Sequence, residues 1–303
     1  MSLAYIALRQ ILTMVILMLI GLACAKFDLI DKEAARKMSN LVLYLVFPLI
    51  ILLSYQRPFQ ADLLRGLGLS LLLGAASFAV ALITTHLIYK NRGSKDYAVD
   101  KFACVYPNSG FLGIPLIYGI FGSEGVFYLT GFLTIFFFLF WTHGMIVMSG
   151  RRNFSEVRKA FTSPPILAIF VGFGLFVFGV QLPDIINTPL SLLADTNTPL
   201  AMLVAGASIY GVKPMATLKD KRIYVICAMR LAILPALTLL ILAPFNIPEI
   251  LRGTIVVLSA CPVAANIILA AHRHGRDYAY ASQAFAASTL LSMGTIPLLL
   301  MLL

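Results

Sequence analysis

The stretch Pro107-Asn108-Ser109-Gly110-Phe111-Leu112-Gly113-Ile114-Pro115 interrupts a long apolar segment of this 303-residue chain near its middle. The stretch Cys261-Pro262-Val263-Ala264-Ala265-Asn266 interrupts a second apolar segment in the other half. Both segments are long enough to cross a bilayer. Helix breakers and side-chain amides are costly at that depth unless neighbouring protein or a water-filled cavity satisfies the freed backbone groups. A matched pair of interruptions, one in each half of a chain, indicates a carrier's binding site.

The composition sets the fold class. Hydrophobic residues make up 60% of the chain, charged residues only 12%, and the mean hydropathy is +0.93, whereas a soluble domain carries about 25% charged residues. We therefore expect an all-α polytopic membrane protein. The first apolar run is too long for a signal peptide, so it is kept as a mature span. The four cysteines lie in apolar segments without paired spacing, which suggests neither disulfides nor a metal site.

Ten stretches approach the roughly 20 apolar residues that a spanning helix needs. They lie at about 4–25, 38–55, 63–89, 102–121, 126–148, 165–180, 190–212, 223–243, 251–271 and 278–303. With this count, the loops after the odd-numbered spans hold 18 of the 23 lysines and arginines. The positive-inside rule then makes those loops cytoplasmic and puts both termini on the outer side. The net charge of +10 is mostly this topology signal, because no basic patch with interleaved aromatics suggests nucleic-acid binding.

An internal repeat relates the two halves. Gly122-Ser123-Glu124 resembles Gly275-Arg276-Asp277 at an offset of 153 residues, and this offset also lays the first interruption over the second. Five spans per half is an odd number, so the second half enters the membrane inverted. We expect a single membrane domain over 1–303, with one five-helix repeat in 1–150 and an inverted one in 151–303.

Several stretches, in this order, resemble the auxin efflux carrier family, in its bacterial branch, within the superfamily that includes the bile acid and arsenite carriers. They are Leu29-Ile30-Asp31 leading to Phe47-Pro48, Asn108 to Leu116, Ser163 to Ala168, Thr198-Pro199-Leu200-Ala201, Gly206-Ala207-Ser208, Ser259-Ala260-Cys261-Pro262, Ala287-Ser288-Thr289-Leu290 and Ile296-Pro297-Leu298. Ser163 departs from the family, which often has asparagine there. The resemblance implies ten helices in two inverted halves, with spans four and nine crossing at their broken centres. It also implies export or exchange of small organic anions, such as dicarboxylates or auxin-like carboxylates, often by a homodimer, and we expect it in a bacterial inner membrane.

The residues at the two interruptions support a substrate site without this resemblance. A helix that restarts in mid-membrane presents unsatisfied N–H groups and roughly half a positive charge, which favours a carboxylate. Asparagine amides add donors and acceptors, although each could instead bond to a neighbouring helix. Prolines fix the breaks and glycines allow close backbone approach. The candidate site residues are Asn108, Ser109, Gly110, Gly113, Pro115, Pro262, Val263, Ala264 and Asn266.

Four further residues have possible charge or gating roles. Arg230 is the one basic residue near the middle of an expected span. It supplies a positive field for an anion, acts as a moving counter-charge, or caps backbone carbonyls between helices. Asp195 and Thr198 stand at the expected outer start of span seven, as a turn and N-cap or as an outer gate. Gln283 lines the cavity or packs between helices.

The leading function is a secondary carrier that works by alternating access. A ligand sensor that moves nothing and an anion channel are the alternatives. An enzyme is not expected, since no His, Asp, Glu or Cys cluster lies within the spans, and neither cofactor nor nucleotide-binding loop is expected. Coupling to protons is possible. Sodium is disfavoured because no Asp or Glu lies between Phe102 and Phe121 or between Leu251 and Ala271. The expected partners are the anion, membrane lipids and a second copy, and no nucleic acid.

Overall fold

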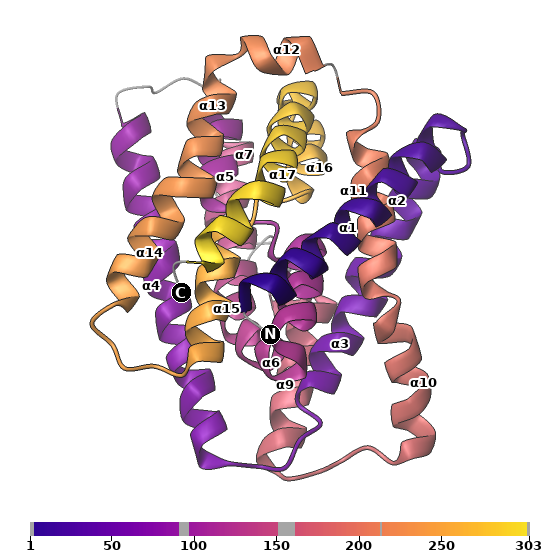
Figure 1. Cartoon of the computed structure of the whole chain (residues 1–303), viewed down its shortest axis with the longest axis vertical. Coiled ribbons are helices and arrows are strands. Elements are labelled where there is room, and N and C mark those ends of the chain that lie inside the picture. The colour runs from indigo at the N-terminus through magenta and orange to yellow at the C-terminus, as the bar shows by residue number, and fades with distance from the viewer. Residues whose placement is uncertain (1–2, 91–96, 151–160, 213, 302–303) are drawn as a thin grey trace.

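The computed structural model describes residues 3–90, 97–150, 161–212 and 214–301, whose regular structure is helical apart from one isolated bridge (Figure 1). The α-helices are α1 (Leu3–Lys26), α2 (Lys32–Leu41), α3 (Phe47–Ser54), α4 (Ala61–Tyr89), α5 (Ala98–Val105), α6 (Ile114–Leu139), α7 (Met145–Ser149), α9 (Pro164–Val177), α10 (Asp184–Asp195), α11 (Asn197–Ile209), α12 (Pro214–Lys219), α13 (Lys221–Ala228), α14 (Leu234–Leu242), α15 (Glu249–Ala260), α16 (Asn266–Arg273) and α17 (Tyr278–Leu300). Four π-helical turns, η1 (Val42–Val46), η3 (Ser109–Gly113), η4 (Phe140–Gly144) and η5 (Met229–Ile233), continue into the helices that follow them.

In the part of the chain that the structure describes, seven helical segments are long and apolar enough to cross a membrane: Tyr5–Lys26, Lys32–Ser54, Ala61–Tyr89, Ser109–Ser149, Asp184–Ile209, Lys221–Leu242 and Tyr278–Leu300. A shorter apolar helix covers Pro164–Val177. The expected all-α polytopic membrane class is therefore confirmed. The count of ten spans and the inverted repeat stay predictions, because the two interruptions leave α5, α15 and α16 individually shorter than a span.

The segment Ser109–Ser149 is longer than one crossing requires. Its 41 residues would extend about 60 Å as a straight helix, twice the roughly 30 Å of the hydrocarbon core. Within it, Gly122 has φ 63° and ψ −155°, outside the helical region. This left-handed φ favours glycine and interrupts the helix direction. The chain thus has a local reason to divide at Gly122, where the sequence predicts a loop between spans four and five.

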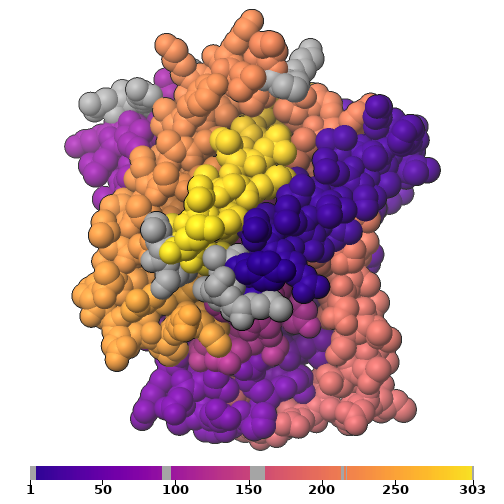
Figure 2. Space-filling model, viewed as in Figure 1, coloured from indigo at the N-terminus to yellow at the C-terminus, as the bar shows by residue number. Residues whose placement is uncertain are grey.

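The packing of the helices divides them into two groups. The first, which we call the flanking bundle, holds α1, α2, η1, α3, α9, α10 and α11. The second, which we call the crossover bundle, holds α4 to α7 and α13 to α17. Most of the flanking bundle lies on one side of the molecule in Figure 1, and the N-terminal part of α1 lies beside the C-terminal helix α17 in Figure 2.

Two glycines set the tightest contact within the flanking bundle. A Cβ on Gly21 of α1 would overlap the backbone of Leu203 in α11, and a Cβ on Gly206 would overlap the backbone of Met18 in α1. Small residues allow membrane helices to approach this closely, and the gain in van der Waals contact replaces the hydrophobic effect that lipid does not supply.

Candidate functional site

Both interruptions begin at a residue that precedes a proline. Helix α5 ends at Val105, and Tyr106 is extended at φ −99° and ψ 109°. Helix α15 ends at Ala260, and Cys261 is extended at φ −58° and ψ 142°. The proline ring disfavours helical geometry in the residue before it, so Pro107 and Pro262 explain why the two helices stop. Both expected breaks are therefore present in the structure.

The two breaks pair with each other. Pro107 and Val263 form an isolated antiparallel bridge. The N–H of Asn108 donates to the carbonyl of Pro262 at 2.8 Å, and the N–H of Ala264 donates to the carbonyl of Tyr106 at 3.1 Å. Each extended strand thus supplies the hydrogen bonds that the other lost with its helix. This exchange allows irregular backbone to exist inside an apolar protein.

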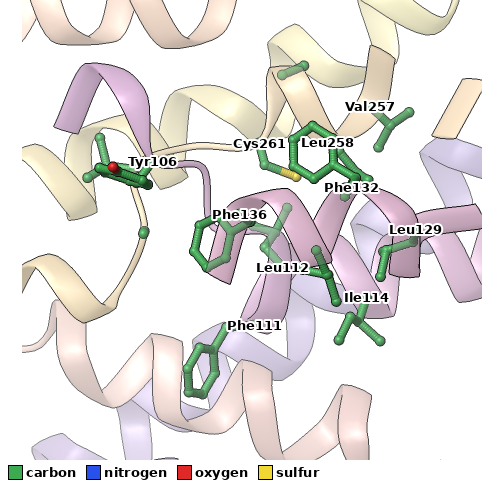
Figure 3. Close-up of a cluster of buried hydrophobic side chains, with 14 of the residues drawn as sticks. Tyr106, Phe111, Leu112, Ile114, Leu129, Phe132, Phe136, Val257, Leu258 and Cys261 are labelled. Atoms are coloured by element: carbon green, nitrogen blue, oxygen red, sulfur yellow. The ribbon is translucent and has the colours of Figure 1, made fainter. Parts of the chain in front are cut away.

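The breaks are packed into the buried core. Figure 3 shows an apolar cluster to which Tyr106 and Cys261 contribute from the breaks, Leu112 from η3 and Leu258 from α15. A Cβ on Gly113 would lie 2.8 Å from the Leu258 side chain, so this glycine permits close approach between η3 and α15. The expected site residues Gly113, Val263 and Ala264 therefore do lie at one crossing.

Backbone donors remain on both sides of the bridge. Asn108 occupies the N-cap position of η3, and its side chain makes no cap hydrogen bond. Among the described residues, the N–H groups of Ser109, Gly110 and Asn266 have no backbone acceptor. Asn108 and Ser109 are buried, while Gly110 and Asn266 are half-buried. The crossing therefore presents unsatisfied N–H groups from two helix starts, beside one amide that does not cap its helix.

Arg230 lies against the C-terminal ends of α5 and α15, where the two helices stop before the breaks. Its guanidinium is 2% exposed. It donates to the carbonyl of Cys104 at 3.3 Å, to that of Ser259 at 2.9 Å, and to that of Cys261 at 2.8 and 3.3 Å. The structure thus shows the carbonyl-capping contacts that the sequence analysis gives as one alternative.

Helix α17 also holds the second break in place. The N–H of Val263 donates to the hydroxyl of Ser288 at 3.1 Å, and that hydroxyl donates to the carbonyl of Phe285 at 3.1 Å. Gln283, the expected cavity residue on this helix, is half-buried and lies five positions before Ser288. Ser288, and not Gln283, makes the described contact to the crossing.

A buried acidic residue also belongs to the crossover bundle. Helix α5 begins at Ala98, so it includes Asp100, which is fully buried. Asp100 pairs with Arg222 of α13 and accepts a hydrogen bond of 2.7 Å from the Tyr280 hydroxyl. The Arg222 guanidinium also stacks 4.5 Å from the Tyr280 ring centroid. Hydropathy places the start of this span at 102, after Asp100, so the sequence does not reveal the ion pair.

Three side-chain hydrogen bonds join the two bundles, and we call them the latch. The hydroxyl of Thr130 donates to the carbonyl of Phe127, so its oxygen accepts from the Tyr55 hydroxyl at 2.6 Å. Arg57 donates to Ser123 at 3.0 Å, and Gln10 donates to the carbonyl of Pro115 at 3.0 Å. The Tyr55 ring also packs edge-on to Phe127, with centroids 5.1 Å apart.

The space between the bundles is small in this conformation. An apolar cleft lies between α1, α11, η3 and α17 and is lined by Ile11, Met14, Val15, Met18, Leu112, Met202, Ser292, Met293 and Ile296. Its volume is about 20 Å³, which suffices for about one water molecule and not for an organic anion. The bundles are therefore closed on each other beside η3.

The structure places three further expected residues at helix ends. Pro115 does not fix the break, because it lies eight positions after Pro107 in the second position of α6, and its carbonyl belongs to the latch. Asp195 ends α10, and Thr198 lies in the first turn of α11. The expected turn is therefore present between them at Thr196, which occupies the cap position without a side-chain cap, and the outer-gate alternative stays a prediction.

Comparisons with known proteins agree with this architecture. Residues 6–300 match a family described as membrane transport proteins. An uncharacterized transporter of Methanothermobacter thermautotrophicus is 26% identical over 306 residues, covering 96% of each chain. An uncharacterized transporter of Methanocaldococcus jannaschii is 27% identical over 217 residues, covering 67% of this chain and 69% of its own.

Proposed function

Since this chain belongs to the membrane transport protein family, we propose that it is a secondary carrier of small organic anions, such as dicarboxylates or auxin-like carboxylates. The match confirms the resemblance to the auxin efflux carrier family and identifies a multi-pass membrane transporter, for which an enzymatic role is not expected. We place the cargo at the crossing of the two breaks, which alternating access would expose to each side in turn.

The observation that carries this proposal is the reciprocal bridge with free donors on both sides. Two helix starts, η3 running into α6 and α16, each carry roughly half a positive charge. No Asp or Glu lies between Phe102 and Phe121 or between Leu251 and Ala271 to oppose them. A carboxylate at the crossing would accept from the N–H groups of Ser109, Gly110 and Asn266, with the Asn108 amide as an orienting group.

The repeat and the topology belong to the same proposal. The bridged residues Pro107 and Val263 are 156 positions apart (263 − 107), three more than the offset of 153 that relates the loop motifs. We propose ten spans in two inverted repeats, with the basic loops cytoplasmic and both termini outside in a bacterial inner membrane. In this orientation the latch lies in the outer half, so the described conformation is closed to the outside.

Counterflow tests the proposal. Protein in proteoliposomes loaded with unlabelled malonate, malate or indole-3-acetate should exchange it for the labelled compound outside. Asn108→Ala and Asn266→Ala should abolish exchange without changing expression or the homodimer content that we expect. Asn246→Ala, at an exposed asparagine of the loop before α15, is the matched control.

The other outcomes separate the alternatives. Exchange by both crossing variants at the wild-type rate would remove these asparagines from the site. Saturable binding without exchange would indicate a sensor, and unitary currents without counterflow an anion channel. Repeating the exchange with imposed proton or sodium gradients identifies the coupling ion, for which protons are our proposal.

A further inference from the structure

We propose that Arg230 makes the crossing selective for anions by neutralising the negative ends of both broken helices. This inference rests on the proposed function, because it concerns the charge of the cargo bound at the same crossing. Arg230 is a positioning and specificity-determining residue here, since its described contacts are to the backbone and none is to a side chain that the cargo would meet.

The contacts of Arg230 reach both repeats at once. Cys104 is in the last turn of α5, while Ser259 and Cys261 are at the end of α15. The last carbonyls of a helix accept no hydrogen bond from an N–H group of the same helix. In lipid, no water is present to donate in its place. One guanidinium satisfies three of these carbonyls with four hydrogen bonds. A lysine could not reproduce this planar fork.

The charges at the crossing can be balanced group by group. The C-terminal ends of α5 and α15 each carry roughly half a negative charge, and the starts of η3 and α16 each carry roughly half a positive one. Without Arg230, the two negative helix ends would offset the two positive helix starts. The crossing would then favour neither an anion nor a cation. The positive charge of Arg230 offsets the two negative ends and leaves the two positive starts uncompensated.

No described carboxylate removes this charge from the crossing. The nearby acidic residue of the same bundle, Asp100, is paired with Arg222 and bonded to Tyr280. Arg230 itself is 2% exposed and forms no ion pair among the described residues. A buried unpaired cation is costly and rare in membrane proteins and usually marks a functional site. We attribute its retention to the anionic cargo, which supplies the missing negative charge when bound.

The test compares an acid with its neutral amide. Purified protein is titrated with malonate and malonamide, and with indole-3-acetate and indole-3-acetamide, and the binding is followed by thermal shift. For each acid–amide pair of which it binds a member, the wild-type protein should bind the acid more tightly than the amide. Arg230→Met keeps much of the side-chain volume and removes the charge, so the acid-to-amide preference should fall about tenfold, as expected for a charge acting through a low-dielectric interior.

Two further variants separate charge from structure. Arg230→Lys retains the charge with poorer hydrogen bonding, so it should keep the acid preference at reduced thermal stability. Arg252→Gln removes a basic side chain at the other end of α15, where Arg252 donates to the carbonyl of Phe245 at 2.9 Å, and it should leave the acid preference unchanged. It is the matched control, because it removes an arginine charge without touching the broken ends or the Asp100 ion pair.

Each outcome decides the inference. An Arg230→Met protein with the wild-type acid-to-amide ratio overturns it, while wild-type binding of the acids leaves the proposed function intact. If the Arg230→Met protein cannot be purified, the Arg230→Lys protein provides the test. Loss of the acid preference in the lysine variant, which retains the positive charge, overturns the inference. Wild-type protein that binds none of the four probes contradicts the proposed function, and this inference with it.

Discussion

At the scale of single residues, Gly110 shows how little room the crossing has. A Cβ at this position would lie 2.5 Å from a ring carbon of Phe47, at the start of α3 in the flanking bundle. Phe47 is almost fully buried and packs edge-on against Phe111, with centroids 5.3 Å apart. An aromatic ring of one bundle therefore covers the helix start that the other bundle presents.

We predict that Gly110→Ala reduces exchange more than tenfold and lowers thermal stability by pushing the Phe47 ring out of its packing, since overpacking costs about 1–3 kcal/mol. Phe47→Leu should restore part of the activity in the double variant, because the shorter side chain leaves space for the methyl group. Counterflow and thermal unfolding measure both effects.

Gly68→Ala is the control for this change. No atom lies within 4 Å of a Cβ at that position of α4. Alanine exceeds glycine in helix propensity by about 1 kcal/mol, so this variant should be as stable as wild type or more so. If Gly110→Ala behaves like Gly68→Ala, Phe47 does not confine the site.

The sequence predicts some of these residue contacts and not others. Pro107 and Pro262 identify the breaks because proline acts on its own neighbours. The carbonyl partners of Arg230 lie 126, 31 and 29 positions away, and such distant main-chain acceptors have no sequence pattern. The alternatives for Arg230 could therefore be stated and not decided. Asp100 escaped prediction because hydropathy averages it with its charged neighbours and therefore starts the span after it, at residue 102.

At the scale of elements, the latch is the described polar connection between the bundles. Tyr55 is one of its buried residues, at 1% exposed, and the tyrosine ring packs against Gly172 of α9, where a Cβ would lie 2.6 Å from the ring. Arg57 adds a cation–π contact, 5.1 Å from the Phe127 centroid. If the bundles separate during transport, these contacts must break.

We predict that Tyr55→Phe shifts the carrier towards the outward-open state about threefold or more, since it removes a hydrogen bond worth about 0.6–2 kcal/mol in a membrane and keeps the ring. A cysteine at Thr134, half-buried one turn from Thr130, reports the shift. Its reaction with an impermeant thiol reagent added outside should accelerate by this factor. Tyr44→Phe, at an exposed tyrosine of η1, should leave the rate unchanged. Equal rates in both variants would show that Tyr55 does not hold the bundles closed.

The elements themselves were largely predictable, and their local geometry was not. All ten expected stretches are mostly helical, because apolar composition over about 20 residues leaves few other structures in lipid. The π turns η1, η3, η4 and η5 were not expected. No residue type specifies such turns, so the sequence pattern gives no signal for them. The turn between α10 and α11 was one of the interpretations of the Asp195–Pro199 cluster, whereas the start of α10 at Asp184, before the expected start of this span at 190, was not expected.

At the scale of the whole molecule, the proposed orientation in the membrane rests on the distribution of basic residues among the loops. Residues of α2 and of the loop before α15 lie on opposite sides of the membrane in the proposed ten-span topology. Lys32 and Asn246 are exposed representatives of the two sides. Three of the four native cysteines are buried, so a reporter cysteine needs only the replacement of Cys24.

We predict that an impermeant maleimide labels Asn246→Cys in intact cells, and Lys32→Cys only after permeabilisation. The reason is the segregation of basic residues into alternate loops, which sets membrane orientation. Gel shift of the labelled protein measures both. Labelling of both sites from one side would contradict the ten-span count. If instead Lys32→Cys is labelled in intact cells and Asn246→Cys only after permeabilisation, the membrane orientation is the reverse of the proposed one.

The main-chain construction of the bridge has a consequence for how such carriers diversify. Because Asn108, Pro262, Tyr106 and Ala264 join through N–H and C=O groups, the hydrogen bonds of the bridge itself do not involve side chains. If the cargo binds there as proposed, substitutions of lining residues other than the prolines and close-packed glycines of the breaks can alter cargo preference while the bridge stays formed. A single architecture can thus serve many unrelated metabolites, and substrate identity should be among the easiest properties of this protein to re-engineer.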